Sequence, residues 1–193
     1  MFEFISGKMV ELYPTYAVIE TGGIGYNINI SLQTFASLEG KTEAMLYLHQ
    51  VVREDAHLLY GFYKKTEREL FRQLISVSGV GANTARVILS SLSADEISRA
   101  IALSDVDTLK RIKGIGLKTA QRIVVDLKDK IGKGGADQDI FAPSNNTLKL
   151  EALSALVMLG FAKSVAEKTI DQLLKQNPGH SVETLIKDAL KGL

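Results

Sequence analysis

The 193-residue sequence contains no cysteine and no tryptophan, and only three prolines and three histidines. Without cysteine the chain can form no disulfide bond, no thiolate metal site and no thiol nucleophile. His49, His57 and His180 do not have the spacing of metal ligands. We therefore expect neither a metal nor another cofactor.

Long apolar runs are also missing. None approaches the roughly 18 residues that a membrane-spanning helix needs, and the amino terminus, MFEFISGKMVELY, lacks the basic segment and apolar core of a secretory signal. These absences predict a cytoplasmic protein. Hydrophobic residues make up 46% of the chain, which is enough for packed cores in one large domain or in two to three small ones.

The net charge of +1 hides an uneven distribution. The formal charge is −4 over residues 1–62, +5 over residues 63–130 and zero over residues 131–193. The middle third is therefore the place to look for a site that binds an anionic partner.

Alternating apolar and polar residues predict five short strands in the first third. The expected strands are Phe2 to Leu12, Tyr16 to Glu20, Tyr26 to Ile30, Ala44 to Val52 and Leu58 to Phe62. So many strands in so short a segment favour a closed barrel, because closure leaves no strand edge unpaired.

From Thr66 the spacing of apolar residues becomes helical. Ser93 and Glu96 have the pattern of a capping box, and the stretch SDVD that begins at Ser104 opens a further helix. Another helix is expected from Leu117 to about Lys130. The middle third should therefore be entirely helical.

Residues 132–147 read GKGGADQDIFAPSNNT and show no periodicity, which predicts a flexible linker. Three helices are expected beyond it: Leu148 to Leu159, Val165 to Leu174 with Ser164 as its cap, and Val182 to Leu190 with Ser181 as its cap. A bundle of this size has a marginal core.

The basic third contains an internal repeat. The stretch SGVGANTA, which begins at Ser78, returns 35 positions later as KGIGLKTA, which begins at Lys113, and each copy lies between two expected helices. Glycines around an apolar residue let the chain turn with positive φ values and let a ligand approach the main chain. The helix that follows presents unpaired N–H groups and the positive end of its dipole, which suits a phosphate.

The residues expected to bind phosphates are the turn glycines and the polar residues that follow them: Gly79, Gly81, Asn83, Thr84, Arg86, Gly114, Gly116, Lys118, Thr119 and Arg122. One such turn between helices is most often only a turn. Two copies in register within the basic third favour phosphate binding. A Walker phosphate loop is excluded, because no GxxxxGK(S/T) pattern occurs.

The two copies are not equivalent. Asn83 stands where the second copy has Lys118. We therefore expect the first turn to bind less strongly and to rely more on main-chain N–H groups.

Two adjacent carboxylates, Glu54 and Asp55, stand in the sequence VVREDAHLLYGF between the last two expected strands. This position predicts a β-hairpin with the acidic pair at its tip. An isolated pair of this kind is ordinarily a solvated loop. In a protein that gathers phosphates, however, these carboxylates would repel nucleic acid, although Arg53 beside them would neutralise part of their charge.

The paired turns resemble tandem helix-hairpin-helix motifs, which hold DNA by its phosphates without regard to sequence. Together with the barrel and VVREDAHLLYGF, they make the whole chain similar to the RuvA family of Holliday-junction-binding proteins. The resemblance implies an α+β multidomain protein. Its parts would be an OB-like five-stranded β-barrel at residues 1–63, an all-α tandem helix-hairpin-helix domain at 64–131, the flexible linker at 132–147 and a UBA-like three-helix domain at 148–193.

The same resemblance implies a function in homologous recombination, DNA repair and the SOS response to DNA damage. The protein would bind four-way junction DNA, hold it open with Glu54 and Asp55 as an acidic pin, and carry no catalytic residue of its own. The implied partners are the hexameric ATPase RuvB, which drives branch migration, the RuvC resolvase, and further copies of the chain in a homotetramer. Two tetramers could sandwich one junction.

The carboxy-terminal domain is expected to contact the ATPase. The apolar candidates for this contact are Leu156, Leu159, Phe161, Leu185 and Ile186. Three short helices need most of these residues for their own core, so the prediction rests on the domain rather than on them.

Two other functions stay open from the residues alone. A helix-hairpin-helix glycosylase or nuclease would need catalytic carboxylates, and Asp126 and Asp129 follow the second turn, but Lys128 and Lys130 indicate ordinary pairing on a helix surface. A scaffold that binds single strands through its barrel would stack bases on aromatic residues over a basic groove. The first third is acidic, and its aromatic residues stand at core-like positions.

Overall fold

The alternating segments of the first third close into a β-barrel in the computed structural model, which describes residues 2–134, 145–177 and 180–192. The strands are β1 (Phe4–Tyr13), β2 (Tyr16–Thr21), β3 (Ile24–Ile30), β4 (Glu43–Val52) and β5 (His57–Phe62). They follow the order β1-β2-β3-β5-β4, and the antiparallel pairing of β1 with β4 closes the barrel. Four of the five pairings are antiparallel, and β3 with β5 is parallel. The expected five-stranded barrel is confirmed.

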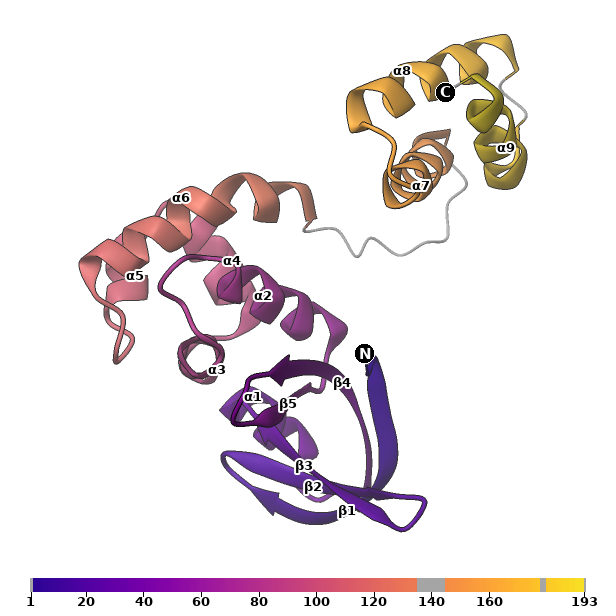
Figure 1. Cartoon of the computed structure of the whole chain (residues 1–193). Helices are drawn as coiled ribbons and strands as arrows, with labels where there is room; N and C mark the ends of the chain where they lie inside the picture. Colours follow the sequence, from indigo (N-terminus) through magenta and orange to yellow (C-terminus); the bar gives the residue numbers. More distant parts are fainter. Residues whose placement is uncertain (1, 135–144, 178–179, 193) are drawn as a thin grey trace. The chain divides into compact units, whose positions relative to one another are not determined.

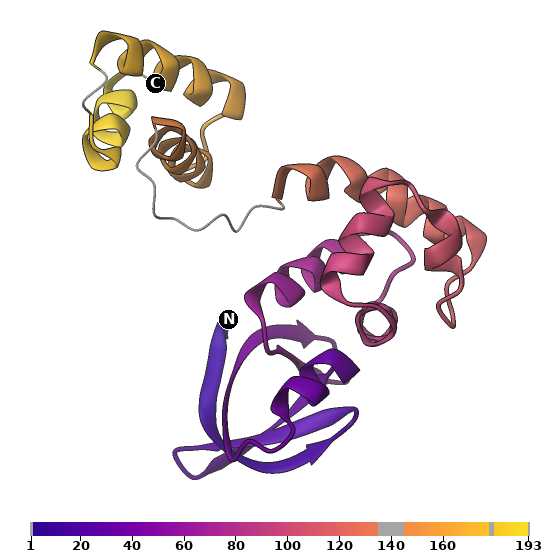
Figure 2. The ribbon, with the colours of Figure 1, turned by 180° about the vertical axis from the view of Figure 1, so that it is seen from behind.

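A short helix, α1 (Leu32–Leu38), lies between β3 and β4 and was not expected from the sequence. The hydroxyl of Ser31 caps it by accepting a hydrogen bond from the N–H of Thr34 (3.0 Å). Leu38 at its other end is fully buried in the barrel core. Figure 2 shows α1 from behind, between the strands and the helices that follow.

Five helices follow the barrel, and the first of them packs against β4 and β5 (Figure 1). They are α2 (Lys65–Ile75), α3 (Ala82–Ser91), α4 (Ala94–Ala102), α5 (Val106–Lys110) and α6 (Leu117–Gly134). Their common core includes Tyr60 and Phe62 of β5, whose rings lie 5.1 and 4.9 Å from the ring of Phe71 in α2. The barrel keeps a core of its own, and the end of β5 also packs into the helical core, so the barrel and these helices belong to one compact unit.

The helix starts expected in this layer are confirmed. Ser93 and Glu96 form a capping box at α4, and the carboxylate of Asp105 caps α5 by accepting a hydrogen bond from the N–H of Thr108 (3.0 Å). Hydrogen bonds to these carboxylates, from Ser93 and from Thr108, lower the pKa of Glu96 and of Asp105.

A second compact unit contains α7 (Asn145–Met158), α8 (Lys163–Gln176) and α9 (Val182–Gly192). The expected linker is shorter than 132–147, because α6 continues to Gly134 and α7 begins at Asn145; its middle, residues 135–144, lies outside the described residues. Ser181 caps α9 as expected. Ser164 does not cap α8, because the N-cap of that helix is Ala162. Within the described residues, no helix combines the length and the apolarity that crossing a membrane requires.

Candidate nucleic-acid interface

The two glycine turns have the same main-chain structure. In the first turn, between α2 and α3, the N–H of Val80 donates to the carbonyl of Val77 (3.0 Å). In the second, between α5 and α6, the N–H of Ile115 donates to the carbonyl of Ile112, also at 3.0 Å. All four apolar side chains are buried in the helical core. The repeat seen in the sequence is therefore a repeat of geometry, in which the apolar residues anchor each turn.

Each turn needs a glycine at its sharpest point. Gly79 has φ of +90° and Gly114 has φ of +88°. Residues with a Cβ atom rarely adopt such positive φ values, whereas glycine does so readily. Two positions later, Gly81 is the N-cap of α3 and makes no side-chain cap. Gly116 holds the same place before α6 and likewise has no side chain with which to cap the helix. Both helices thus begin with main-chain donors at an open end, which is the structure that an anion requires.

The second turn carries the stronger positive charge. Lys118 is exposed in the first turn of α6, next to the half-buried Thr119. Arg122, one turn further on, donates from Nη1 to the carbonyl of Ser78 in the first glycine turn (3.0 Å). This hydrogen bond ties the two turns together, a contact between positions 44 apart that no local pattern reveals.

The first turn directs its polar side chains toward the barrel. Asn83 accepts a hydrogen bond at Oδ1 from the hydroxyl of Tyr60 (3.2 Å). Arg86 donates from Nη1 to the carbonyl of Thr15 (2.9 Å) and to Oδ1 of Asn29 (3.2 Å). These contacts hold the Nη1 end of the Arg86 guanidinium against the barrel, which points to a structural part for this side chain. The half-buried Thr84 and the main-chain N–H groups remain as candidates on this turn.

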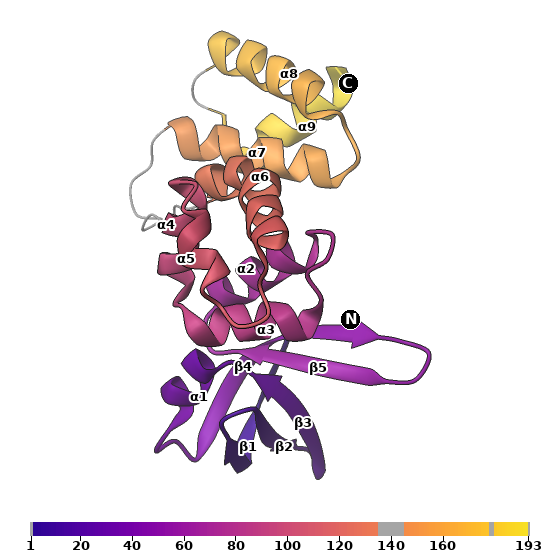
Figure 3. The ribbon, with the colours of Figure 1, turned by 90° about the vertical axis from the view of Figure 1, so that its left-hand side faces the viewer.

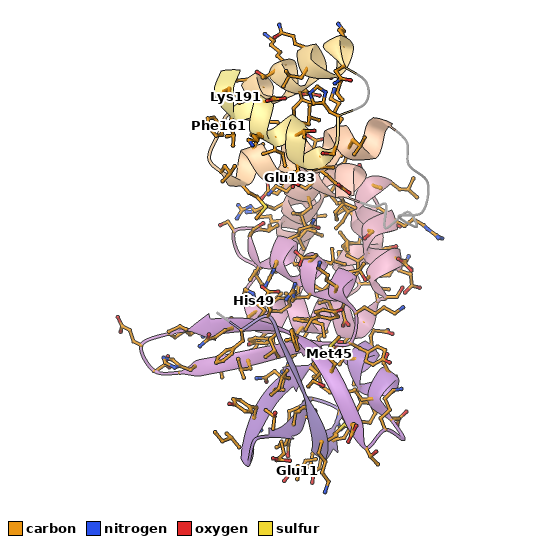
Figure 4. The ribbon with its side chains drawn as sticks, turned by 90° about the vertical axis from the view of Figure 1, so that its right-hand side faces the viewer. Glu11, Met45, His49, Phe161, Glu183 and Lys191 are labelled. Carbon is orange, nitrogen blue, oxygen red and sulfur yellow. The ribbon has the colours of Figure 1, made fainter. Side chains whose placement is uncertain are left out.

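The acidic pair lies at the tip of the β4–β5 hairpin, which projects beyond the barrel in Figure 3. The last paired residues are Val52 and His57, and the N–H of Arg53 donates to the carbonyl of Ala56 (2.8 Å). Glu54 and Asp55 are therefore the two residues at the turn, and both are exposed. The hairpin leaves the compact unit near His49, which Figure 4 labels where the strands meet the helices.

A buried carboxylate joins the barrel to the helices. Glu67, in the first turn of α2, accepts hydrogen bonds from the hydroxyls of Ser31 and Thr34, the latter at 2.9 Å. The hydroxyl of Thr34 accepts in turn from the N–H of Tyr63 (3.1 Å). Burial raises the pKa of Glu67, although the two hydroxyl donors oppose that rise. These hydrogen bonds were not predicted from the sequence, because Glu67 lies more than 30 positions from Ser31 and Thr34.

A buried arginine forms a second joint. Arg68 is 2% exposed and donates from Nη1 to the carbonyl of Glu3 (2.9 Å) and to its carboxylate (2.6 Å). The guanidinium also lies 5.4 Å from the ring centre of Tyr47 on β4. The hydrogen bond and charge of Arg68 lower the pKa of Glu3. Glu67 therefore fastens α2 to the start of α1, and Arg68 fastens it to the residue before β1.

The alternative of an enzyme gains no support from the carboxylates after the second turn. Asp126 and Asp129 are exposed, and among the described residues no group of three His, Cys, Asp or Glu side chains could hold a metal. Lys128 does not pair with them as expected: its Nζ donates to the hydroxyl of Ser104 (2.7 Å). This lysine therefore ties α6 to the residue before α5.

Some of the apolar residues expected to contact the ATPase are buried inside the carboxy-terminal unit. Leu156 and Leu185 are fully buried in its core, and Phe161 and Ile186 pack against the same core. Leu156 and Leu185 therefore hold the three helices together and cannot form an exposed contact. Leu159 is 60% exposed and adjoins Met158, which is 86% exposed. Met158 ends α7 and Leu159 follows it, and the unit has further exposed apolar residues: Leu150, Val157, Val165 and Leu190. A partner would cover apolar surface of this kind.

The fold and the site define a class of protein. A closed barrel that presents a carboxylate tip shares one compact unit with two uncapped helix starts, the second beside an exposed lysine. That combination defines a protein that holds nucleic acid by its backbone through tandem helix-hairpin-helix turns, without base-reading side chains at the turns.

Comparison with known proteins agrees along the chain. Residues 1–61 match the family model described as RuvA N terminal domain, residues 71–129 the SAM-like helix-hairpin-helix tandem, and residues 150–193 the RuvA C-terminal domain. Relatives in Christiangramia forsetii and Bacteroides fragilis are 51% and 49% identical to it, and each alignment covers all of both chains. A relative in Flavobacterium psychrophilum is 48% identical over the same extent. Each is called Holliday junction branch migration complex subunit RuvA. The chain belongs to the RuvA family.

Proposed function

We propose that this chain binds four-way DNA junctions without regard to sequence, holds them open, and serves branch migration as the DNA-binding subunit of a complex. The relatives that it matches over its whole length carry the name of such a subunit. The observation that carries the proposal is the pairing of attraction and repulsion within one compact unit: two glycine turns that suit phosphates, and an exposed carboxylate pair on a projecting hairpin.

The phosphate contacts are assigned to the two turns. Main-chain N–H groups at the starts of α3 and α6 would bind phosphate oxygens, with Lys118, Thr84 and Thr119 beside them. These groups recognise the DNA backbone and not the bases, so any duplex arm fits. Arg122 contributes by holding the two turns at a fixed separation.

The acidic tip supplies the preference for a junction. At an effective dielectric constant near 20, a carboxylate about 6 Å from a phosphate costs on the order of 3 kcal/mol before salt screening. A continuous duplex laid across the tip would carry that cost at Glu54 and Asp55. A four-way junction can spread its strands around the tip, so the repulsion disfavours the linear form.

The partners follow from the shape of the substrate and from the family. Four arms invite four copies of the chain in a closed ring, because linked sites gain affinity through effective concentration. Two such tetramers would sandwich one junction. The motor is a separate ATPase, RuvB, contacted by the unit of α7–α9 through Met158 and Leu159, and RuvC would act on the same junction. A cytoplasmic location, with roles in recombination, repair and the SOS response, belongs to the same proposal.

A binding competition tests the proposal. Single strand, linear duplex and four-way junction compete for the parent protein and for the Glu54→Ala/Asp55→Ala protein at one salt concentration. We expect the parent to prefer the junction and the double variant to lose most of that preference by gaining affinity for duplex. The matched control is Glu39→Ala/Glu43→Ala, which removes two exposed carboxylates elsewhere on the barrel. An unchanged preference in the tip variant would refute the assignment.

A further inference from the structure

One face of α3 is polar and bound to the barrel. Asn83, Arg86 and Ser90 are three and four residues apart, so they lie along one side of the helix. The N–H of Leu32 donates to the hydroxyl of Ser90 (3.1 Å), and that hydroxyl donates to the carbonyl of Arg86 (2.8 Å). Figure 3 shows α3 lying across the barrel beside β5. The helix that opens the first phosphate turn is therefore fastened along its length.

Two of these contacts lead to β5. Asn83 binds the hydroxyl of Tyr60 directly. Arg86 binds Oδ1 of Asn29, and Nδ2 of the same asparagine donates to the carbonyl of Leu59 (3.2 Å). Both routes thus end at adjacent residues of the strand that forms one side of the acidic hairpin.

Tyr60 links α3 to the β4–β5 hairpin, and its side chain is held firmly. It is 1% exposed, and its ring lies against Phe71 of α2, so the side chain is held by packing as well as by its hydroxyl. Tyr60 pairs with His49 on β4, and the tip begins beyond the pair formed by Val52 and His57. The hydroxyl of Tyr60 therefore connects Asn83 of α3 to the base of the hairpin.

The second repeat lacks this face. Positions 35 further along from Asn83, Arg86 and Ser90 are Lys118, Gln121 and Val125. All three are exposed. The two repeats therefore differ along this face, which forms hydrogen bonds to the barrel and α1 in the first repeat and is exposed in the second.

We propose that Asn83 and Arg86 are positioning residues that fix the acidic hairpin relative to the first phosphate turn, through Tyr60 and Asn29, and thereby set the preference for junction over linear duplex. The inference rests on the proposed function and assigns these two residues a part in specificity in place of phosphate contact. Repulsion discriminates only when the carboxylates are held where a duplex would pass, because the Coulomb energy falls with distance.

The first test removes a single hydroxyl. Tyr60→Phe keeps the ring in its core position and removes the donor to Asn83. We expect the ratio of junction affinity to duplex affinity to fall by about two- to tenfold, the range of one neutral hydrogen bond. The salt dependence of binding should not change, because no phosphate contact is lost. A ratio within measurement error of the parent's overturns the inference.

Two further proteins make the result specific. In Asn83→Ala/Tyr60→Phe the ratio should fall no further than in Tyr60→Phe alone, because both changes break one hydrogen bond. Additive losses would overturn the proposed coupling. Lys118→Ala tests the proposed function separately: if it leaves affinity for all substrates unchanged, phosphate binding at the turns is wrong, whatever Tyr60→Phe does.

The second test measures position directly. The parent chain has no cysteine, so Arg53→Cys at the tip and Val87→Cys on the exposed side of α3 can carry a pair of spin labels. We expect a single narrow distance distribution, which Tyr60→Phe broadens while the melting temperature stays close to the parent's. If the distribution does not change, the inference is wrong even if the affinity ratio falls, because the tip would then not have moved.

Discussion

The two glycine turns share one main-chain structure, but the helices that follow them, α3 and α6, have different surroundings. The first helix, α3, turns Asn83 and Arg86 to the barrel, whereas α6 exposes Lys118 and Gln121 at the equivalent positions. A duplicated motif can therefore keep its function in the main chain while its side chains diverge. In this molecule the first copy is hydrogen-bonded to the barrel that carries the acidic tip. The second copy supplies the positive charge of Lys118 for binding DNA.

The largest expected effect comes from breaking what the two turns share. Gly114→Val places a β-branched residue at φ of +88°, and Gly79→Val does so at +90°. Each should cost about 1–3 kcal/mol of stability and distort the turn, with at least tenfold loss of junction affinity. Chemical denaturation and a binding titration measure the two effects. Gly116→Ala is the control for the fold, because an added Cβ there meets no atom within 4 Å. Equal losses of stability in the control would contradict the strain argument.

The next effect separates the two helix faces. Arg86→Ala removes two hydrogen bonds to the barrel and should lower the free energy of unfolding by about 1–3 kcal/mol. The equivalent change in the second repeat, Gln121→Ala, should stay within about 0.5 kcal/mol of the parent, because the side chain is exposed. Urea titrations of the two variants decide the point. Similar free energies for both would mean that α3 is not fastened as described.

A smaller effect separates the two turns as DNA ligands. Lys118→Ala should weaken binding to all sequences and reduce the slope of log affinity against log salt by about one unit. Asn83→Ala should leave that slope nearly unchanged, since the asparagine carries no charge and binds Tyr60. Binding isotherms at four salt concentrations give both slopes. Equal changes of slope would remove the distinction between the turns.

The smallest expected effect is a pH dependence of stability that comes from His49, on β4 of the acidic hairpin. Burial, with the charges of Arg72 and Arg68, lowers the pKa of His49 below the ordinary histidine value of 6.5. Folding therefore favours neutral imidazole: the stability is fully present above pH 6.5 and is lost as the pH falls toward the lowered pKa. His49→Gln should flatten this part of the stability profile. His57→Gln, which removes a histidine exposed near the tip, is the control. A parent profile that is flat between pH 7.5 and about 5 would contradict the assignment.

The sequence predicted what depends on neighbouring residues. Gly79 and Gly114 mark turns because only local geometry decides their φ, and Glu54 and Asp55 mark a hairpin tip because strands flank them closely. The same reason explains the correct caps at Ser93 and Ser181 and the correct helix start after Ser104. Five strands, the helical layer and the separate carboxy-terminal unit followed from periodicity alone.

What the sequence did not predict depends on contacts between distant positions. Helix α1 spans seven residues, too few for a clear period, and its cap Ser31 is held by Glu67 from another element. The place of Arg86 in the repeat gives no sign of its hydrogen bond to Thr15, which lies 71 positions away. Leu156 and Leu159 read alike in a short apolar helix, and only packing decides that the first is core and the second surface.

In the proposed function, the turns attract phosphates while the acidic tip repels them. The effect of this opposition can be measured at the centre of a four-way junction, where the strands exchange. A fluorescent base analogue such as 2-aminopurine, placed at the centre of a four-way junction, brightens when its base unstacks. The parent protein should brighten the centre but not a copy of the analogue within an arm. Glu54→Gln/Asp55→Asn, which keeps the shape of the tip and removes its charge, should bind the junction with the centre left dim. Equal brightening by the uncharged tip would contradict the account.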